Sequence, residues 1–490
     1  MVERLYIRML YFCQMRYISY PFFAFICLCK TVTAQEKWDL RKIVDYALVN
    51  NISIKQLDVQ SAISGLNYKQ TKLNQYPNAS VSGSTAFNSG RNQDPTSFNL
   101  ITQSYLSAGL QLQTSADIFN WFSKRNTILA YEWQYEAAKA SADKLRNDIA
   151  LTVANNYLQV LLAREQENIA QVQLKQTQAQ LANTRKLVNA GALAELNASE
   201  LESQEALDSA NYITAKGSVI QSLLVLKAYM NMDAAAPFDV AVPPVELIPI
   251  ENIADLQPDA VYALAVKNLP QQRVNDFKLR AAQSFAAAAK GTMYPTIGAF
   301  GSLGSGFNSQ SRDIRGFTFS NDSIGKVQVN GTSYSVYPNQ PFANPVYGKT
   351  AFFNQWNQNF RQSIGLSLSI PIFNGAQLRS NYQRSKLDIR NAELQQAADN
   401  MQIKQDIYQA YNAATVALEK FNASEKSVAA AQRTYDYAQK RYSVGMMGTF
   451  ELITQQNNLF RAKLQQVLNQ FDYVFKVKVL EFYRGQGLKL

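Results

Sequence analysis

The side chains that perform most enzymatic chemistry are almost missing from this sequence. Histidine does not occur in the 490 residues, and the only cysteines are Cys13, Cys27 and Cys29, close to the N-terminus. Without imidazole or thiolate, the rest of the chain cannot build a histidine base, a cysteine nucleophile, a disulfide or a zinc site with sulfur or nitrogen ligands. We therefore expect a protein that is not an enzyme and that uses no cofactor and no metal.

The remaining patterns that could catalyse or bind are weak. Glu200 and Glu202 lie on a predicted helix surface, where a solvated charge is a commoner role than a catalytic one. Gly301, Gly304 and Gly306 lie in a predicted strand and loop rather than before a helix, so they do not form a phosphate-binding loop. The net charge is +11, but basic and acidic residues are interspersed, which favours a solvated surface and predicts no nucleic-acid partner.

The first 34 residues have the pattern of a secretory signal. Basic residues open the segment, an apolar run follows over residues 20–29, and the small or β-branched residues 32–34 supply a cleavage site. The apolar run is too short to cross about 30 Å of hydrocarbon as a helix. We therefore expect residues 1–34 to be removed and the rest of the chain to leave the cytoplasm. Lipid attachment at Cys27 or Cys29, or a later start at Met9 or Met15, is an open alternative.

The chain repeats one plan twice. Phe119-Asn120 is followed 72 residues later by Gly191, and Phe373-Asn374 is followed 72 residues later by Gly445. Agreement of several such pairs in one order indicates an internal duplication. The expected units are a signal peptide over residues 1–34, a first repeat over 35–232, a proline-rich linker over 233–257 and a second repeat over 258–490.

The second repeat contains an insertion. Tyr76-Pro77 matches Tyr294-Pro295 at an offset of 218, whereas the pairs farther along match at 254, so about 36 residues are added in between. The segment from Asn308 to Asn354 is rich in glycine, asparagine and serine, a composition typical of loops. We therefore predict a long external loop there.

Two segments alternate strictly between apolar and small polar residues. In residues 106–113 and 363–370 every second side chain is Leu, Ile or Ala, and those between are Ser, Gly or Gln. Period two predicts strands, which suit either a half-buried sheet of a soluble protein or a membrane barrel with a wet lumen. The signal pattern, the 26 tyrosines and 26 phenylalanines and the lack of another core for these strands favour the barrel. Membrane strands are expected at about 78–118 and 296–372.

Very long helices are predicted after each pair of strands. Residues 123–189 and 376–444 contain neither proline nor glycine, and a helix of that length runs about 100 Å. Apolar side chains in the second segment recur at spacings of three and four, as in a coiled-coil seam. Shorter helices over 52–75 and 197–230 would together match one long helix. The predicted fold is therefore mainly α with a membrane β-barrel portion, built from duplicated β-β-α-hairpin repeats.

Three motifs give the sequence a resemblance to a known family. They are the strand-to-helix junction Ser369–Gly375, Tyr294-Pro295 before a strand, and above all Arg441–Gly445. Together with the duplication, these residues resemble the TolC-like outer-membrane efflux factors, over the chain from Trp38 to Gly487. The resemblance implies a homotrimer in the outer membrane, in which the strands form a 12-stranded barrel and the helices a 12-helix periplasmic tunnel.

The residues that close the tunnel in this family map onto five positions. The tyrosine is kept as Tyr442, whereas Asn197 stands in place of its acidic partner and Met447 in place of the closing arginine. Of two acidic residues at the constriction, one is kept as Glu451 and the other is replaced by Thr454. The resemblance therefore implies a tunnel gate from which most of the ionic lock is missing. A neutral hydrogen bond between Tyr442 and Asn197 is one expected substitute.

Two glycine-centred turns end the long helices. A left-handed cap accounts for Gly191 and Gly445 without any binding role. In the family, however, these turns meet the tip of a periplasmic adaptor. The resemblance carries that docking role to Gly191, Ala192, Leu193, Gly445, Met446 and Gly448. Met446 and Met447 would supply flexible apolar contact.

The leading hypothesis is a duct that passively exports substrates from the periplasm, or from an inner-membrane pump, to the exterior as part of a tripartite efflux or type I secretion system. The implied partners are two further copies of the chain, outer-membrane lipid, a periplasmic adaptor (membrane fusion protein) and an inner-membrane pump of the resistance-nodulation-division or ABC type. The alternative is a structural coiled-coil envelope protein without transport. Glutamines between residues 166 and 180 favour the duct, because they predict a wet helix face.

Overall fold

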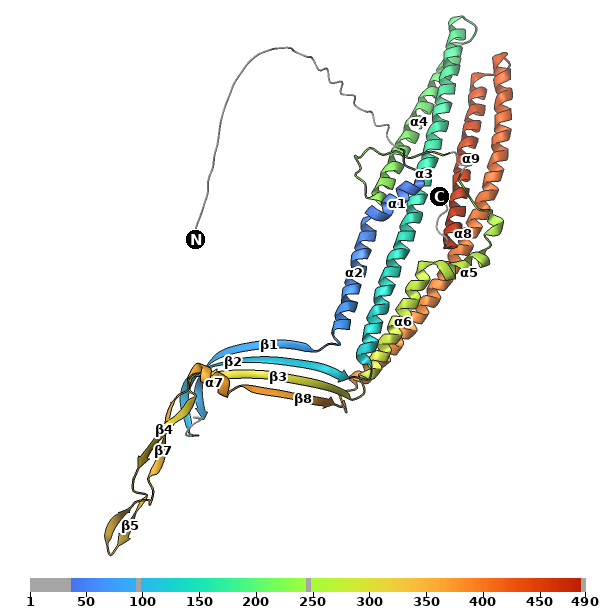
Figure 1. The fold of residues 1–490 in the computed structure, drawn as a ribbon. Coiled ribbons are helices and arrows are strands. Elements are labelled where there is room, and N and C mark those ends of the chain that lie inside the picture. The colour runs from blue at the N-terminus through green and yellow to red at the C-terminus, as the bar shows by residue number, and fades with distance from the viewer. Residues whose placement is uncertain (1–36, 94–97, 244–247, 486–490) are drawn as a thin grey trace, which may run out of the picture.

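The chain is elongated, with long helices at one end and strands at the other (Figure 1). The computed structural model describes residues 37–93, 98–243 and 248–485, and the predicted signal over 1–34 lies outside them. No helix in these ranges has both the length and the apolar character needed to cross a bilayer.

The elements form two series of the same order. The first series is α1 (Leu40–Asn50), α2 (Ile52–Leu73), β1 (Asn78–Gln93), β2 (Leu100–Phe119), α3 (Ser123–Asn189) and α4 (Glu195–Met230). The second series is α5 (Pro258–Asn268), α6 (Pro270–Gly291), β3 (Thr296–Asn308), β8 (Arg361–Ser369), α8 (Gln377–Ser443) and α9 (Thr449–Tyr483), preceded by the one-turn helix η2 (Ile253–Asp255). The two long helices occupy the predicted segments to within one residue, as expected where neither proline nor glycine interrupts. The duplication in sequence is therefore also a duplication of elements.

Polar caps and prolines set the bounds of the shorter helices. Asn51 separates α1 from α2, and its side-chain oxygen accepts hydrogen bonds from the backbone N–H groups of Ser53 (2.9 Å) and Ile54 (3.3 Å). This is the pattern of a helix N-cap. Pro258 and Pro270 are the first residues of α5 and α6, where the missing N–H removes no helical hydrogen bond.

The four long strands form one antiparallel sheet in the order β1-β2-β3-β8. Its register places Val81, Leu112 and Leu303 side by side on one face, and Ser80 and Gln113 side by side on the other. This confirms the predicted strands with one apolar and one small polar face. The outer strands β1 and β8 each keep an edge to which no other described strand is paired.

The insertion in the second repeat, predicted to be a long external loop, contains regular elements. It forms two antiparallel ribbons and a short helix, namely β4 (Arg312–Ser320) with β7 (Phe342–Lys349), β5 (Gly325–Val329) with β6 (Thr332–Val336), and α7 (Phe352–Gln358). The turn Asn330-Gly331 has positive φ at both residues (51° and 80°), which is the geometry of a tight hairpin and explains why an asparagine–glycine pair stands there. Most of the ribbon residues are exposed, and the ribbons extend beyond the sheet, away from the helices (Figure 1).

Each long helix is covered by two shorter helices. α2 and α4 pack along α3, α6 and α9 pack along α8, and α6 also lies against α3, which joins the two series. The largest cluster of buried apolar side chains includes Leu161 of α3, Leu226 of α4 and Phe471 of α9. A second cluster includes Ile407 and Leu480. The prediction that two shorter helices together match one long helix is confirmed.

The junctions between sheet and helices repeat the same backbone conformation. Two consecutive residues with positive φ precede each long helix, Trp121 (49°) and Phe122 (61°) before α3, and Gly375 (62°) and Ala376 (60°) before α8. This conformation costs free energy for any residue larger than glycine. At the first junction the indole N–H of Trp121 donates to the carbonyl oxygen of Pro295 at 2.7 Å, which ties the strained turn to the start of β3.

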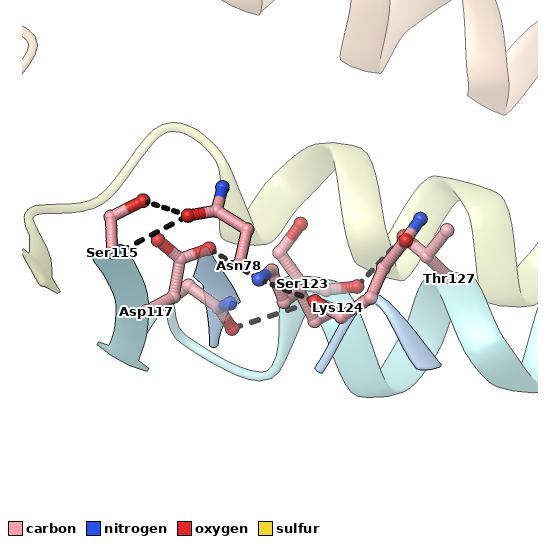
Figure 2. A network of polar contacts seen from close by, with 8 residues as sticks. Asn78, Ser115, Asp117, Ser123, Lys124 and Thr127 are labelled. Carbon is pink, nitrogen blue, oxygen red and sulfur yellow. Dashed lines mark hydrogen bonds and ion pairs between the residues drawn. The ribbon is translucent and has the colours of Figure 1, made fainter. Parts of the chain in front are cut away.

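Polar contacts fasten the first junction to its neighbours (Figure 2). The side-chain oxygen of Asn78, at the start of β1, accepts hydrogen bonds from the backbone N–H (3.0 Å) and the hydroxyl (2.8 Å) of Ser115 on β2. The ammonium of Lys124 on α3 pairs with Asp117 at 2.8 Å and donates to the carbonyl oxygen of Asn74 at 2.9 Å. The end of the sheet is thereby joined to both α2 and α3.

The linker between the two series is anchored to the helices by polar contacts. The hydroxyl of Tyr157 donates to the carbonyl oxygen of Ala241 at 2.6 Å, and burial, with a smaller contribution from the charge of Asp39, raises the pKa of this phenol to about 12. The guanidinium of Arg164 pairs with Asp239 at 2.6 Å. The described linker residues before η2 form no helix and no named strand, as their prolines predict.

The packing of α6 on α3 predicts that one methyl group added at Gly291 destabilises the protein. A Cβ at Gly291 would lie 2.9 Å from the carbonyl oxygen of Trp121 and 3.2 Å from the Cα of Ser123, and these backbone atoms cannot rotate aside. We expect Gly291→Ala to lower the free energy of unfolding by about 1–3 kcal/mol, the usual cost of overpacking. The measurement is the temperature at which the helical circular dichroism signal is lost.

Gly217→Ala is the matched control, because a Cβ at Gly217 meets no atom within 4 Å and alanine favours a helix by up to about 1 kcal/mol over glycine. The control should keep or raise that temperature. Equal behaviour of the two variants would contradict the close approach at Gly291.

Candidate functional site

Both long helices end in the same turn, and each turn centres on a glycine. Gly191 after α3 and Gly445 after α8 have φ values of 72° and 73°. In each turn the glycine N–H bonds to the carbonyl oxygen three residues back, and the next N–H bonds to the carbonyl oxygen five residues back, at 2.8 Å after α3 and 2.9 Å after α8. This is the Schellman pattern of helix termination. The predicted left-handed glycine caps are confirmed.

The turns expose apolar side chains. Met446 is 69% exposed. Leu196 and Phe450, which occupy equivalent positions in the first turns of α4 and α9, are 66% and 70% exposed. Such side chains, repeated at both turns, form an apolar surface that is available for a partner.

The predicted docking residues differ in their exposure. Gly191, Ala192, Gly445, Met446 and Gly448 are exposed, and Leu193 is half-buried. Met447 packs against a buried cluster that contains Tyr435 and Leu452. Of the two methionines, Met446 therefore offers the predicted apolar contact, whereas Met447 faces the inside of its own hairpin.

A layer of polar side chains joins the two helical hairpins beside these turns. The hydroxyl of Tyr442 on α8 lies 3.1 Å from that of Thr184 on α3 and 3.4 Å from that of Thr449 on α9. The hydroxyl of Thr449 donates to the side-chain oxygen of Asn197 on α4 at 2.6 Å. Thr449 therefore stands between Tyr442 and Asn197, in place of the direct bond expected from the sequence. We call Thr184, Asn197, Tyr442 and Thr449 the outer polar layer.

A second polar layer lies deeper in the bundle. This inner polar layer consists of Thr177 on α3, Gln204 and Asp208 on α4, Tyr435 on α8 and Gln456 on α9. The amide of Gln456 donates to the hydroxyl of Thr177 at 2.9 Å, and this hydroxyl donates to the carboxylate of Asp208 at 2.7 Å. The amide of Gln204 donates to the other carboxylate oxygen at 2.8 Å. Thr177, Asp208 and Gln456 are at most 2% exposed, so these bonds are shielded from water.

A spacing of seven residues relates the two layers on every helix. The pairs are Thr177 with Thr184, Asn197 with Gln204, Tyr435 with Tyr442, and Thr449 with Gln456. Seven residues advance a helix by about 10 Å and return the side chain to the same face. This signal is present in the sequence, but it is carried by polar residues, whereas a helical seam is recognised by its apolar ones. Thr184, Thr449 and the inner layer were therefore not predicted.

Some glutamines of α3 near these layers are not exposed to water. Gln173 is buried at 6% exposure, and the amide of Gln176 donates to the hydroxyl of Tyr435. The prediction that the glutamines of residues 166–180 form a water-facing stripe is therefore wrong for these two, because Gln173 is buried and Gln176 bonds to the other hairpin.

The two remaining predicted gate residues lie on the surface. Glu451 is exposed in the first turn of α9, where the positive end of the helix dipole favours a carboxylate. Within the described ranges of the single chain, its carboxylate forms no hydrogen bond and no ion pair. Thr454 is also exposed, and its hydroxyl donates to a carbonyl oxygen of its own helix at 2.8 Å. Both side chains are free to face a neighbouring copy or solvent.

The groups at the tips are suited to binding and holding rather than to reaction. The described part of the chain contains no cluster of three acidic, histidine or cysteine side chains that could hold a metal ion. The two layers consist of hydroxyls, amides and one carboxylate, and their bonds connect the α3–α4 hairpin to the α8–α9 hairpin. Burial raises the pKa of the Tyr435 phenol, which keeps it neutral. The layers therefore hold the two hairpins together without a cation–carboxylate pair.

Comparisons with known proteins agree in one family. A family model described as outer membrane efflux protein matches residues 43–232 and 261–485. Outer membrane protein TolC of Escherichia coli strain K12 is 22% identical over 380 residues, which cover 77% of this chain and 68% of TolC. The crystal structure of CusC has a TM-score of 0.72 at 16% identity, covering 92% of this chain and 93% of that one. The outer membrane protein VceC of Vibrio cholerae has a TM-score of 0.70 at 14% identity, covering 91% and 96%.

The outer polar layer predicts how the tips respond to the loss of one hydroxyl. Thr449→Val removes two hydrogen bonds at nearly constant volume, and each such bond contributes about 0.5–1.5 kcal/mol. We expect backbone amide hydrogen exchange in residues 184–200 and 438–456 to accelerate roughly tenfold, because the hairpins separate more often. Mass spectrometry of the peptides from these two segments measures the change.

Thr454→Val is the control, since it makes the same replacement on the same helix at an exposed hydroxyl that bonds only to its own helix. Exchange at both tips should be unchanged. Acceleration confined to the α9 peptide in Thr449→Val, with the α3–α4 tip unaffected, would show that the layer does not couple the hairpins.

Proposed function

The chain belongs to the outer membrane efflux protein family and is an outer-membrane channel of an efflux system, and we propose that three copies form a passive duct whose periplasmic end is held closed by the two polar layers. The observation that carries the proposal is the four-stranded sheet, with one apolar and one small polar face and two unpaired edges. The apolar face suits lipid and the polar face suits a water-filled lumen. The long helices then extend into the periplasm.

The number of strands supports an assembly. Four strands cannot close a barrel, for which about eight is the minimum, and unpaired edges are excluded from hydrocarbon. Pairing of β1 in one copy with β8 in the next satisfies both edges. Three copies give twelve strands and, from α3, α8 and the shorter helices stacked on them, a twelve-helix tunnel.

The sheet also favours a duct over a structural stalk. A coiled-coil envelope protein without transport would need no water-filled interior, whereas serines and glutamines such as Ser80, Gln113 and Ser302 lie side by side across three neighbouring strands. The matched family consists of efflux proteins, which supports a duct without a catalytic step. Export would then draw its energy from an inner-membrane pump.

The polar layers support closure by neutral contacts. Asn197 and Met447 replace the charged residues of the family's ionic lock, and Tyr442 bonds to hydroxyls of Thr184 and Thr449 instead. Opening by separation of the α3–α4 and α8–α9 hairpins would break those bonds of both layers that cross between the hairpins. Because the described bonds of the two layers include no ion pair, closure by these layers would depend little on salt concentration.

The two turns support docking of a periplasmic adaptor. Met446, Leu196 and Phe450 are exposed around glycine turns of matching shape, so three copies would present six similar apolar tips. Residues Gly191, Ala192, Leu193, Gly445, Met446 and Gly448 form these proposed docking turns. The adaptor would in turn connect the duct to a pump of the resistance-nodulation-division or ABC type.

The exposed carboxylate of Glu451 predicts the ion preference of the duct. Threefold symmetry places three such carboxylates in a ring near the closed end, next to the uncharged Thr454. We expect Glu451→Gln to lower the cation selectivity of single channels in planar bilayers and to abolish block by multivalent cations added from the periplasmic side, because the ring loses its charge. The control is Glu419→Gln, which changes an exposed residue of α8 far from the turn at Gly445. It should change neither property. An unchanged reversal potential in Glu451→Gln would remove Glu451 from the constriction.

The glycine geometry predicts an effect of the docking turns on efflux. Gly445→Val places a β-branched side chain at a φ of 73°, which costs about 1–2 kcal/mol locally. We expect lower efflux and weaker adaptor cross-linking in cells, while the amount of trimer is kept. Gly217→Ala is the control, because Gly217 lies within α4, outside the docking turns, and a Cβ there meets no atom within 4 Å. Normal efflux by an assembled Gly445→Val protein would argue against a docking role for this turn.

A further inference from the structure

The inserted ribbons carry an apolar face that the single chain leaves uncovered. Cross-strand pairing places Ile314 beside Tyr347, Phe317 beside Pro345 and Phe319 beside Ala343. These six residues lie on one side of the β4–β7 ribbon, which we call the apolar ribbon face. An extra residue at Arg315 shifts the register and keeps Ile314 on the same side as Phe317.

The opposite face of the ribbon is more polar. There Thr318 pairs with Asn344, Gly316 with Val346 and Ser320 with Phe342, so that only two of its residues are large and apolar. On the apolar ribbon face, the two basic residues Arg312 and Lys349 stand opposite each other at the root, and no charged side chain follows toward the tip. The β5–β6 ribbon has the same division, with Val327 beside Tyr334 on one face and Gln328 beside Ser333 on the other.

The apolar ribbon face is exposed to water in the single chain. Ile314 is 53% exposed, Phe317 55% and Phe319 71%. Two-stranded ribbons are marginally stable alone in water, and a contiguous exposed apolar face of this kind marks an interaction surface. The ribbons extend beyond the sheet and away from the helices (Figure 1), so lipid around the sheet does not cover them.

We propose that the apolar ribbon face packs against the same face of the other two copies, so that three ribbons meet on the threefold axis and form a collar outside the cell. The inference rests on the proposed trimer. The partner of the apolar ribbon face is another copy of the chain, because the ribbon is connected to the strand edge that the trimer must pair. β7 leads through α7 directly into β8, and the unpaired edge of β8 is one of the two that meet a neighbouring copy. Three ribbons are therefore rooted beside three subunit seams.

Cysteine scanning along β4 tests the collar, since residues 30–490 contain no cysteine. Single substitutions Ile314→Cys, Phe317→Cys and Phe319→Cys report the apolar ribbon face, and Asp313→Cys, Thr318→Cys and Ser320→Cys report the opposite face as matched controls. Intact cells are treated with a short bismaleimide, which tolerates a wider separation than a disulfide. Denaturing electrophoresis then measures the cross-linked dimer, and light scattering of the same extracts in mild detergent measures the assembly.

The expected result is a dimer at the three apolar positions, at least tenfold above the three controls, in extracts that contain trimers. Trimers without cross-linked dimers, equal cross-linking on both faces, or cross-links to a different protein would each overturn the collar while leaving the duct intact. Extracts that contain only monomers would instead overturn the proposed trimer. Replacement of residues 312–349 by a short glycine–serine linker should leave the trimer assembled, which separates the collar from the barrel seam.

Discussion

The unpaired backbone N–H and C=O groups at the two free edges of the sheet are the constraint on which the rest of the structure depends. Inside hydrocarbon an unpaired N–H or C=O group costs several kcal/mol, because no water replaces its partner. β1 and β8 each present a row of such groups, so the sheet needs neighbours. Another copy of the chain supplies such a neighbour in the proposed pairing of β1 with β8. In the proposed trimer, symmetry would then determine how the helices, the tips and the ribbons of the three copies meet.

In the proposed duct, the helices form the gate. Two polar layers, about one heptad apart, connect the hairpins that follow each half of the sheet. The duplication gives the second hairpin Glu451 where the first has Asn197, so one position serves as a neutral bonding partner in one repeat and as an exposed charge in the other. Buried Asp208 is satisfied by the hydroxyl of Thr177 and the amide of Gln204. A buried carboxylate that is bonded in this way favours one arrangement of the helices over others.

Much of the fold could be predicted from the sequence because its local signals are strong. Residues 123–189 contain no helix breaker, and the helix occupies that segment; strict alternation in 363–370 likewise gives a strand. The insertion was assigned to a loop because its composition hides an Asn330-Gly331 hairpin turn between short alternating segments. The polar layers were missed because they depend on which helices lie side by side. Only Tyr442 and Asn197 were expected near each other, and the hydroxyl of Thr449 that joins them belongs to a third helix.

The mass of the protein extracted from outer membranes in mild detergent tests the threefold assembly most directly. Light scattering or mass photometry should show one species with three times the mass of the chain, because paired edges keep the barrel closed without lipid. That species should lose its mass only when heating or strong detergent separates the strands. A monodisperse monomer that retains its helical circular dichroism would contradict the pairing of β1 with β8 and, with it, the duct.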